Sequence, residues 1–336
     1  MGFSSQSGQV ILKTQAAPGI LDPALGTDGV GIKLRGGSLG TSRELLIPDA
    51  EIGGGRDVVD GYLGAVSWSG DYEFYARMDS VATLLRACLG LADAPVTDAL
   101  GFTTHTIRPS DSGTLPFLSV EEAIGGNLEV FNYYDAVVNT FHLEAEANGY
   151  LQGTAGLIAA RQTAGVTKTA TPVWDNTPMI VGTNIFVTYN GVTLPAKSFS
   201  LDINNNVEDD DYRLGSFYIG DLTAKRREIT ASFGIRANNS ALWRQATYGL
   251  AAATAPGGIA TKQELVISMK TYEMVGTSAV PYSLDLTFPK FVLSPFTLEQ
   301  SGDDVIENDV EGQAIRPDSA IDVATAVIVT EKATIA

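Results

Sequence analysis

The sequence predicts an all-β protein made of two tandem domains, each with one short helix. Its 336 residues include 35 glycines, and short runs rich in Val, Ile, Thr, Tyr and Phe alternate with turn residues, a composition typical of strands joined by turns. A stretch with the pattern of a strand followed by a short helix also occurs twice, beginning at Asp71 and again at Thr230. Composition and repetition therefore favour the same architecture.

The two copies of this stretch, Asp71–Leu91 and Thr230–Leu250, align without a gap. Asp79 and Asn238 are placed to cap the helix starts, and a glycine ends the helix in each copy. Identical residues occupy these positions: Phe74 and Phe233, Arg77 and Arg236, Ala82 and Ala241, Ala87 and Ala246, Gly90 and Gly249, and Leu91 and Leu250. Matching caps indicate a tandem duplication, with chance similarity between two short helices as the alternative.

Both predicted helices carry an apolar stripe that would pack on a sheet. In the first copy, Leu84, Leu85 and Cys88 share one face with Val81 and Leu89. The second copy has Leu242 and Trp243 on the corresponding face, where the large indole could fill the volume of two leucines. We therefore predict both helices to belong to a domain core.

The length and the repeat divide the chain into four parts. Residues 1–30 have little periodicity and are expected to form an extended arm that cannot bury itself without a partner surface. Residues 31–161 form the predicted first domain, 162–184 a linker rich in Thr, Ala and Pro, and 185–336 the second domain.

In the first domain, alternating patterns predict strands separated by turns. The predicted strands are 32–35, 44–47, 65–76, 105–107, 117–121, 128–133, 137–146 and 150–161. The glycine run 53–55, followed by Arg56 and Asp57, lacks the phosphate-binding pattern and is expected at a mobile hairpin tip.

The second domain follows the same order of strand, long loop, strand and helix. Asn190-Gly191 predicts a type I′ hairpin turn. The predicted strands are 185–189, 192–194, 198–207, 225–235, 264–274, 282–292, 295–299 and 323–330. Val292, Phe296 and Leu298 also repeat the spacing of Val137, Phe141 and Leu143, which extends the duplication beyond the helices.

Composition excludes several classes of function. The net charge of −17 argues against binding a polyanion, and the basic cluster Lys225-Arg226-Arg227 is expected on a solvated or inter-subunit face. No stretch has the length and apolarity of a membrane span, so cytoplasmic synthesis is expected. The single Cys88 predicts no disulfide framework.

The sequence offers no convincing catalytic, cofactor or metal site. Asp202-x-Asn204-x-Asn206 starts like a calcium loop but lacks the glycine and the final glutamate. Glu121 and Glu122 are adjacent, so along a strand they point to opposite faces and cannot easily share a proton. His105 and His142 are remote from any nucleophile motif. We predict a protein that is not an enzyme.

Three motifs resemble a known family. Ser198–Glu208 (SFSLDINNNVE), Arg226–Phe233 (RREITASF) and Leu115–Gly126 (LPFLSVEEAIGG) are similar to tail tube proteins of long-tailed, siphovirus-type bacteriophages, in the versions with a duplicated tube domain. The resemblance covers about residues 30–330, although its motifs are patterns of strand and loop.

The resemblance implies a structural protein of the virion tail, assembled in the host cytoplasm. Each domain would be a β-sandwich or barrel that contributes strands to a ring-shaped inner β-barrel, and three chains would form a pseudo-hexameric ring. Rings would stack into a tube around a tape-measure protein, between tail terminator and distal-tail proteins. Double-stranded DNA would pass without tight binding, because an acidic lumen repels phosphates.

Two segments are expected to make inter-subunit or inter-ring contacts. Apolar and aromatic residues interrupt the acidic loop Asn205–Asp221, and this composition predicts docking on another subunit after a mobile free state. The candidate contact residues are Asp209, Asp210, Asp211, Tyr212, Arg213, Leu214, Phe217 and Tyr218, with Arg56 and Asp57.

Two other functions fit the same patterns. A distal-tail or baseplate hub protein would share the barrel domain but form one discrete ring. A secreted two-domain β-sandwich that binds carbohydrate or acts as an adhesin is more remote, because no signal peptide or solvent-facing aromatic row supports it.

Overall fold

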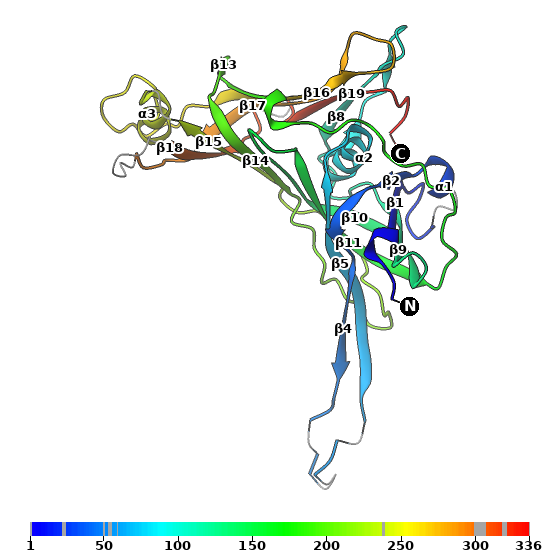
Figure 1. Ribbon diagram of the computed structural model, residues 1–336. Coiled ribbons are helices and arrows are strands. Elements are labelled where there is room, and N and C mark those ends of the chain that lie inside the picture. Colours follow the sequence, from blue (N-terminus) through cyan, green and yellow to red (C-terminus); the bar gives the residue numbers. More distant parts are fainter. Residues whose placement is uncertain are drawn as a thin grey trace.

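The computed structural model describes residues 2–21, 25–49, 51–52, 56–58, 60–236, 239–298, 307–317 and 321–335. It confirms the all-β class with short helices. The strands form one large sheet in which every ladder is antiparallel (Figure 1). A long hairpin projects from the body, and a wing carries the second helix at its far end.

Within the described residues, the first half of the chain contains eleven strands and the helices α1 and α2. Its strands are β1 (Gln9–Thr14), β2 (Val30–Ile32), β3 (Leu34–Gly37), β4 (Gly40–Leu46), β5 (Tyr62–Tyr75), β6 (Gly90–Ala92), β7 (Val96–Thr97), β8 (Thr103–Pro109), β9 (Leu118–Ile124), β10 (Glu129–Glu146) and β11 (Gln152–Ala164). The helices are α1 (Leu25–Asp28) and α2 (Met78–Leu89).

The second half repeats the order of strand, long excursion, strand and helix. Its strands are β12 (Ile185–Tyr189), β13 (Val192–Thr193), β14 (Ala196–Asn204), β15 (Glu228–Arg236), β16 (Gln263–Met274), β17 (Pro281–Leu293), β18 (Glu307–Ala314) and β19 (Thr325–Thr330), and its helix is α3 (Ala241–Tyr248). Asn190 and Gly191 both have positive φ, as the predicted hairpin turn requires.

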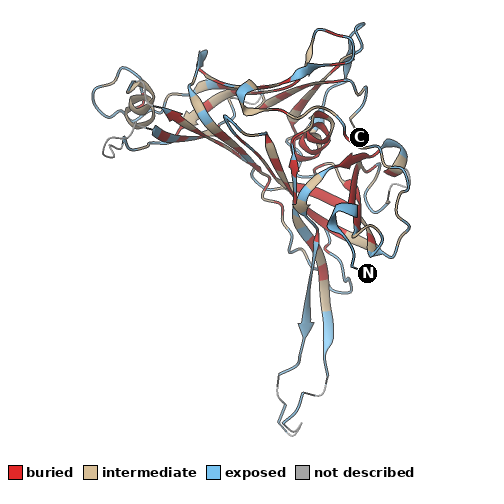
Figure 2. Cartoon of the chain, in the orientation of Figure 1, coloured by how far each residue is buried: buried red, intermediate tan, exposed pale blue. Residues whose placement is uncertain are grey.

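Six strands form the centre of the sheet in the order β5, β11, β10, β14, β15 and β18. Their registers align in continuous rows, such as Phe74, Gly153, Leu143, Leu201 and Ala231 on the inner face. Side chains alternate along each strand, so one face packs on the core and the other meets solvent (Figure 2). The centre of the sheet therefore has one apolar and one polar face.

Ladders join the two halves at two places. β10 pairs with β14, and β8 pairs with the C-terminal β19. One core cluster contains buried side chains from both halves. The domain boundaries at 31–161, 162–184 and 185–336 stay a prediction, but the halves share a sheet and a core.

The N-terminal segment is not an unburied arm throughout. β1 lies between β2 and β9, and Ile11 and Leu12 are buried. The expectation that residues 1–30 need a partner surface is therefore wrong for β1. Its apolar run Val10-Ile11-Leu12 is short enough to be missed by periodicity, yet it fits the middle of a sheet.

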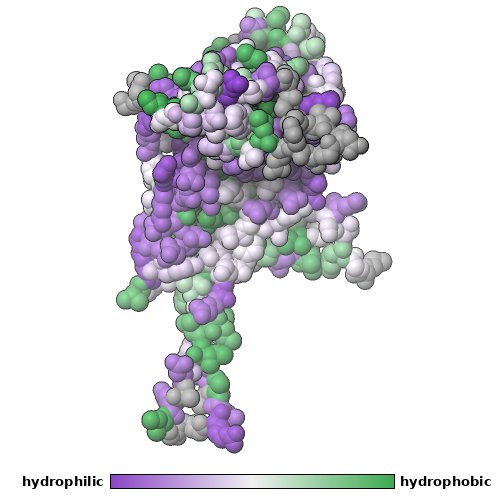
Figure 3. Space-filling model, turned by 90° about the vertical axis from the view of Figure 1, so that its left-hand side faces the viewer, coloured by the Kyte–Doolittle hydropathy of each residue, from purple (hydrophilic) through white to green (hydrophobic). Residues whose placement is uncertain are grey.

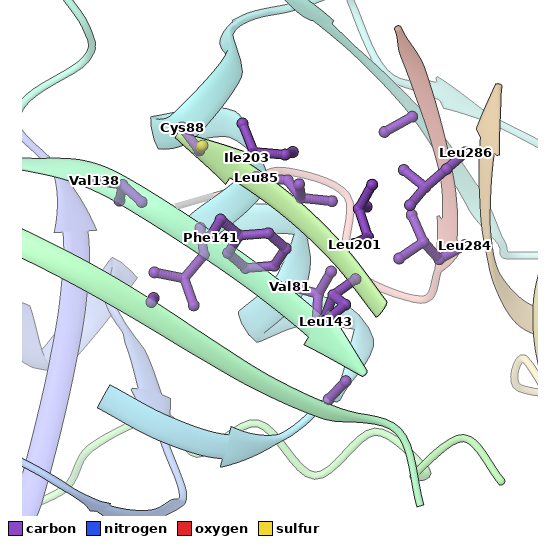
Figure 4. Packing of buried hydrophobic residues seen from close by; sticks show 14 of the residues in the cluster. Val81, Leu85, Cys88, Val138, Phe141, Leu143, Leu201, Ile203, Leu284 and Leu286 are labelled. Atoms are coloured by element: carbon purple, nitrogen blue, oxygen red, sulfur yellow. The ribbon is translucent and has the colours of Figure 1, made fainter. Parts of the chain in front are cut away.

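Helix α2 lies at the centre of the core, as its stripe predicts. Leu84, Leu85 and Cys88 are fully buried. Figure 4 shows Val81, Leu85 and Cys88 facing Phe141 and Leu143 of β10, with Leu201 and Ile203 of β14 beside them. The left-handed backbone of Gly90, with φ 103°, ends the helix.

The start of α2 is capped from a distance. Asp79 lies inside the first turn and its carboxylate accepts from Thr330, so the prediction that it is the N-cap is wrong. Asp175 Oδ2 instead accepts hydrogen bonds from the Ser80 amide and hydroxyl, each at 2.7 Å, and Thr177 Oγ1 accepts from the Met78 amide. The predicted linker therefore contributes a cap that sequence proximity could not reveal.

Helix α3 differs from its counterpart. Gly249 ends it in the left-handed conformation, with φ 88°, as predicted. Ser240 precedes its first residue, and the predicted cap Asn238 lies outside the described residues. Leu242 and Trp243 are only partly buried, and Leu242 packs against the main core cluster. α3 therefore covers the margin of the core, and its role as a second core helix stays a prediction.

Three predicted strand assignments also differ. Residues 128–133 and 137–146 belong to one long strand, β10, which continues through Asp135 despite its φ of 54°. Strand β18 was not predicted. Residues 295–298 lie outside any strand, whereas the sequence around Phe141 that they resemble lies in β10.

Among the described residues, no helix has the length and apolarity needed to cross a bilayer.

The remote cap gives a stability prediction. Asp175→Ala removes hydrogen bonds to Ser80 and to the Thr177 amide and hydroxyl, so we expect a loss of about 2–3 kcal/mol in the free energy of unfolding. Asn176→Ala, at the exposed neighbouring position, should change it by less than about 0.5 kcal/mol. Denaturant melts of both variants measure the difference, and equal melts would show that the cap is not needed.

Candidate functional site

The solvent face of the six central strands is a continuous acidic surface. One row across it runs through Glu73, Thr154, His142, Asp202 and Thr230. Nine exposed carboxylates lie on this face, which we call the acidic face: Asp71, Glu73, Glu144, Glu146, Asp202, Glu228, Glu307, Asp309 and Glu311. Both halves of the chain supply them.

Cationic side chains that contact the acidic face lie at its margins. Lys197 pairs with Glu307, and Arg35 from the neighbouring β3 donates to Gln152 and lies over the Tyr75 ring. In the middle, His142 Nδ1 is 2.6 Å from Asp202 and its Nε2 is 3.5 Å from Glu144. The surface therefore repels polyanions across its centre.

The buried carboxylates are held by structural hydrogen bonds. Glu121 accepts from Gln9 and from the amide and hydroxyl of Thr169. Glu122 accepts from the Leu39 amide and the Tyr72 hydroxyl, and burial raises the pKa of Glu122. The two carboxylates thus have separate partners, as adjacent strand positions predict.

The other reactive groups are also part of the core. Burial raises the pKa of Cys88 to about 12, and Asn205 donates to its sulfur. His105 donates to or accepts from the Lys332 carbonyl across 2.8 Å. Within the described residues, no cluster of His, Cys, Asp and Glu is arranged to hold a metal ion.

The hairpin formed by β4 and β5 projects far from the body (Figure 1). Along its stem, hydrophobic side chains are exposed, and Figure 3 shows them as a stripe below the hydrophilic body. The apolar residues are Leu45, Leu46, Ile47, Tyr62 and Leu63, each at least 48% exposed. Such a patch is typical of a surface that another protein covers.

Arg56 and Asp57 are exposed in the loop that joins β4 to β5, and the glycine run 53–55, expected at a mobile tip, lies outside the described residues. The sequence analysis did not single out the apolar stem residues. Leu45 and Leu63 are cross-strand partners, and their pairing across a long polar excursion could have indicated an exposed hairpin.

The loop 205–227 of the second half folds back onto the base of that hairpin. The Val66 amide donates to the Phe217 carbonyl at 2.8 Å, and the Tyr218 ring lies 6.3 Å from that of Trp68. Arg161 lies over the Tyr218 ring. The base of the loop thus packs on its own chain, where a mobile segment was expected, and docking of the loop on another subunit stays a prediction.

A small second core fixes the base of the loop. Ile219 and Leu222 are buried with Leu115, Val137 and Ile158. Asn205, also buried, donates to the carbonyls of Cys88 and Val138 and accepts from Arg227. Replacing Asn205–Asp221 by a short turn would remove these contacts, so it would disturb the fold as well as any assembly contact.

Two of the predicted contact residues, Asp211 and Arg213, form an ion-pair cluster with Asp221, and the hydrogen bonds from Arg213 lower the pKa of Asp211. All the predicted contact residues of the loop except Asp211 are exposed: Asp209, Asp210, Tyr212, Arg213, Leu214, Phe217 and Tyr218. Phe217 and Tyr218 also contact the base of the hairpin. Leu214 is fully exposed. The outer end therefore remains open to a partner while the ion pairs hold its shape.

Comparison with known proteins gives one family. The sequence profile of a family described as phage tail tube protein matches residues 5–314, nearly the whole chain. A comparison with curated proteins finds no match.

The docked loop gives a prediction for the unassembled chain. We expect slow hydrogen exchange at the amides of Val66, Gly220 and Ala224, which donate to the carbonyls of Phe217, Asp211 and Gly113. Tyr218→Ala should speed exchange at Val66 roughly five- to tenfold, because it removes about 1 kcal/mol of ring and cation–π contact. Tyr212→Ala is the matched control. Fast exchange in the unaltered chain would show that the loop is free.

Proposed function

This chain belongs to the phage tail tube protein family and is a structural tail tube protein, and we propose that its copies close into rings that stack into a channel for DNA. The observation that carries the proposal is the acidic face, a wide polar surface built from six neighbouring strands. A sheet that curves with this face inward would line a channel.

An acidic channel suits the passage of DNA. Each passing phosphate meets exposed carboxylates, so no counterion release stabilises a bound state. The polar hydroxyl and amide groups between them, such as Thr154 and Ser200, keep the surface hydrated. DNA then slides through without tight binding.

We propose three chains in each ring. Each chain carries two copies of the order strand, excursion, strand and helix, so three chains give six similar units. Both copies contribute to one acidic face, since β10 and β14 pair directly. Closure of the sheet into a ring removes edges that would otherwise aggregate.

The hairpin and the loop 205–227 fit a contact between rings. They emerge at equivalent places, between β4 and β5 and between β14 and β15, and lie against each other at their bases. The exposed hairpin stem and the outer loop residues would bind the next ring. Arg56 and Asp57 would contact it near the hairpin end.

The remaining partners follow from a tube of this kind. A tape-measure protein would occupy the channel during assembly, and terminator and distal-tail proteins would bind the two ends of the tube. Assembly would take place in the host cytoplasm, and the finished tube would be part of the virion tail.

The hairpin stem tests the proposal. Leu45→Asp with Leu63→Asp places two charges on the exposed cross-strand pair, so we expect an unchanged melt but loss of tubes, because a charge buried at an interface is costly. Ser42→Asp on the same strand is the matched control. Negative-stain electron microscopy and sedimentation measure tube length, and tubes of normal length from the double variant would contradict the proposed contact.

The acidic face gives a second prediction. Double-stranded DNA should not bind the protein measurably at physiological salt. Replacing Glu144, Asp202 and Glu311 by Lys should create binding that weakens as salt rises, because the three lysines neutralise phosphates. Fluorescence anisotropy measures both, and micromolar binding by the unaltered protein would be inconsistent with a non-adhesive channel.

A further inference from the structure

An open apolar groove lies beside α3. Its volume is about 330 Å³. Leu242 and Trp243 of α3 form one wall, and Leu194, Ile235, Phe296 and Leu298 line the rest of it. Tyr189, Ile235 and Asn308 are buried, and the other residues that line it are partly buried or exposed. Among the described residues, this apolar surface is therefore open on one side.

The corresponding place beside α2 is filled. There Phe141 and Leu143 of β10 lie against the helix, and Leu201 and Ile203 of β14 complete the cover (Figure 4). β14 reaches this place from the second half by pairing with β10 from Thr140 to Glu146. A strand from the neighbouring unit thus covers the first helix.

The surroundings of α3 resemble those of α2 in the repeat, but within the described residues no strand corresponds to the β14 cover. Phe296 and Leu298 have the spacing of Phe141 and Leu143. The Ser294 amide donates to the Glu311 carbonyl, so the pairing of β17 with β18 continues one residue past the end of β17. Within the described residues, no ladder pairs the other edge of segment 294–298.

The counterpart of β14 in the first half is β3. Phe199 of β14 pairs with Phe233, and Leu34 of β3 pairs with Phe74. Phe74 and Phe233 are equivalent in the repeat, so Leu34 stands where Phe199 stands. β14 has a ladder on both edges, whereas the described ladders of β3 involve only β5.

We propose that β3 of a second copy of this chain pairs with segment 294–298 and covers the α3 groove. This joint would repeat the β10–β14 joint within the chain, and it rests on the proposed ring. Segment 294–298 and β3 would each gain the backbone partners that a sheet edge lacks. Leu34 would face the groove as Phe199 faces the core.

Charge supports the choice of partner. Lys33 and Arg35 are exposed beside the edge of β3, and Glu307, Asp309 and Glu311 are exposed on β18 next to the receiving segment. Opposite charges would thus meet when the two edges approach, which speeds and orients association.

The internal joint fixes the register of the proposed one. His142 lies opposite Asp202, and Asp202 opposite Thr230. The repeat aligns Glu73 with Ser232. His142 joins Glu73 through Thr154, and Ser294 joins Ser232 through Glu311, so Ser294 stands where His142 stands. Thr230 corresponds to Asp71, which the register of β3 and β4 places opposite Ser38. Ser294 of one copy should therefore lie opposite Ser38 of the next, and both are exposed in the single chain.

Disulfide cross-linking tests the joint. Directly opposed strand residues have Cα atoms about 4.5–5.5 Å apart, which permits a disulfide. Assembled protein that carries Ser38→Cys and Ser294→Cys should give bands of two and three linked chains on a non-reducing gel after mild oxidation. Each single variant, and the pair Ser42→Cys with Ser294→Cys, should remain one chain.

The outcomes separate this inference from the proposed function. Rings without the cross-link, or equal cross-linking of the control pair, would overturn the joint alone. An unaltered chain that forms no ring would overturn the proposed function and this joint with it.

A second measurement uses Leu298→Asp. This variant should keep the melt of the single chain, because the Leu298 side chain is 38% exposed, yet it should abolish rings. Rings at normal yield would contradict the joint.

Discussion

The structure depends on the burial of one helix by strands from both halves of the chain. α2 is buried against β10 of the first half and β14 of the second. Each fully buried leucine in such a contact contributes about 1.5–3 kcal/mol relative to its exposed state, so separating β14 from β10 would expose a large apolar surface. This packing holds the two halves of the chain in one sheet and gives that sheet a single polar face.

The same constraint explains the surfaces that remain. Because the inner face of the sheet covers helices, its carboxylates gather on the opposite face. Because no strand covers α3 within the described part of the chain, the wing carries an apolar groove, and no described ladder pairs the outer edge of segment 294–298. The β10–β14 ladder joins the two halves, and segment 294–298 and β3 are the parts from which a similar ladder could form between chains. The similar order of elements in the two halves is therefore a physical reason to expect a similar ladder between chains.

The sequence predicted what local patterns determine. The apolar stripe of α2, the glycines that end both helices and the Asn190-Gly191 turn depend on residues close together in the chain, and all three were correct. Apolar and polar residues also alternate in the sequence of β10, and Glu144 and Glu146 are exposed as that alternation requires.

Long-range contacts could not be predicted in this way. Asp175 caps a helix almost a hundred residues earlier, and Asn205 joins α2, β10 and Arg227 through its side-chain amide. The loop around Tyr218 looked like a free acidic segment because its partner Trp68 lies in the other half. Strand β18, in contrast, could have been predicted from its own alternating pattern, because Asn308 and Val310 are buried and Asp309 and Glu311 are exposed.

The central claim is that the acidic face lines a channel enclosed by three chains. A cryo-electron microscopy map of assembled tubes tests it most directly. The account predicts three chains in each ring, with Glu144 and Asp202 facing the channel and α2 and α3 on the outside of the sheet. Six chains in a ring, or an acidic face turned toward the outer surface of the tube, would contradict it.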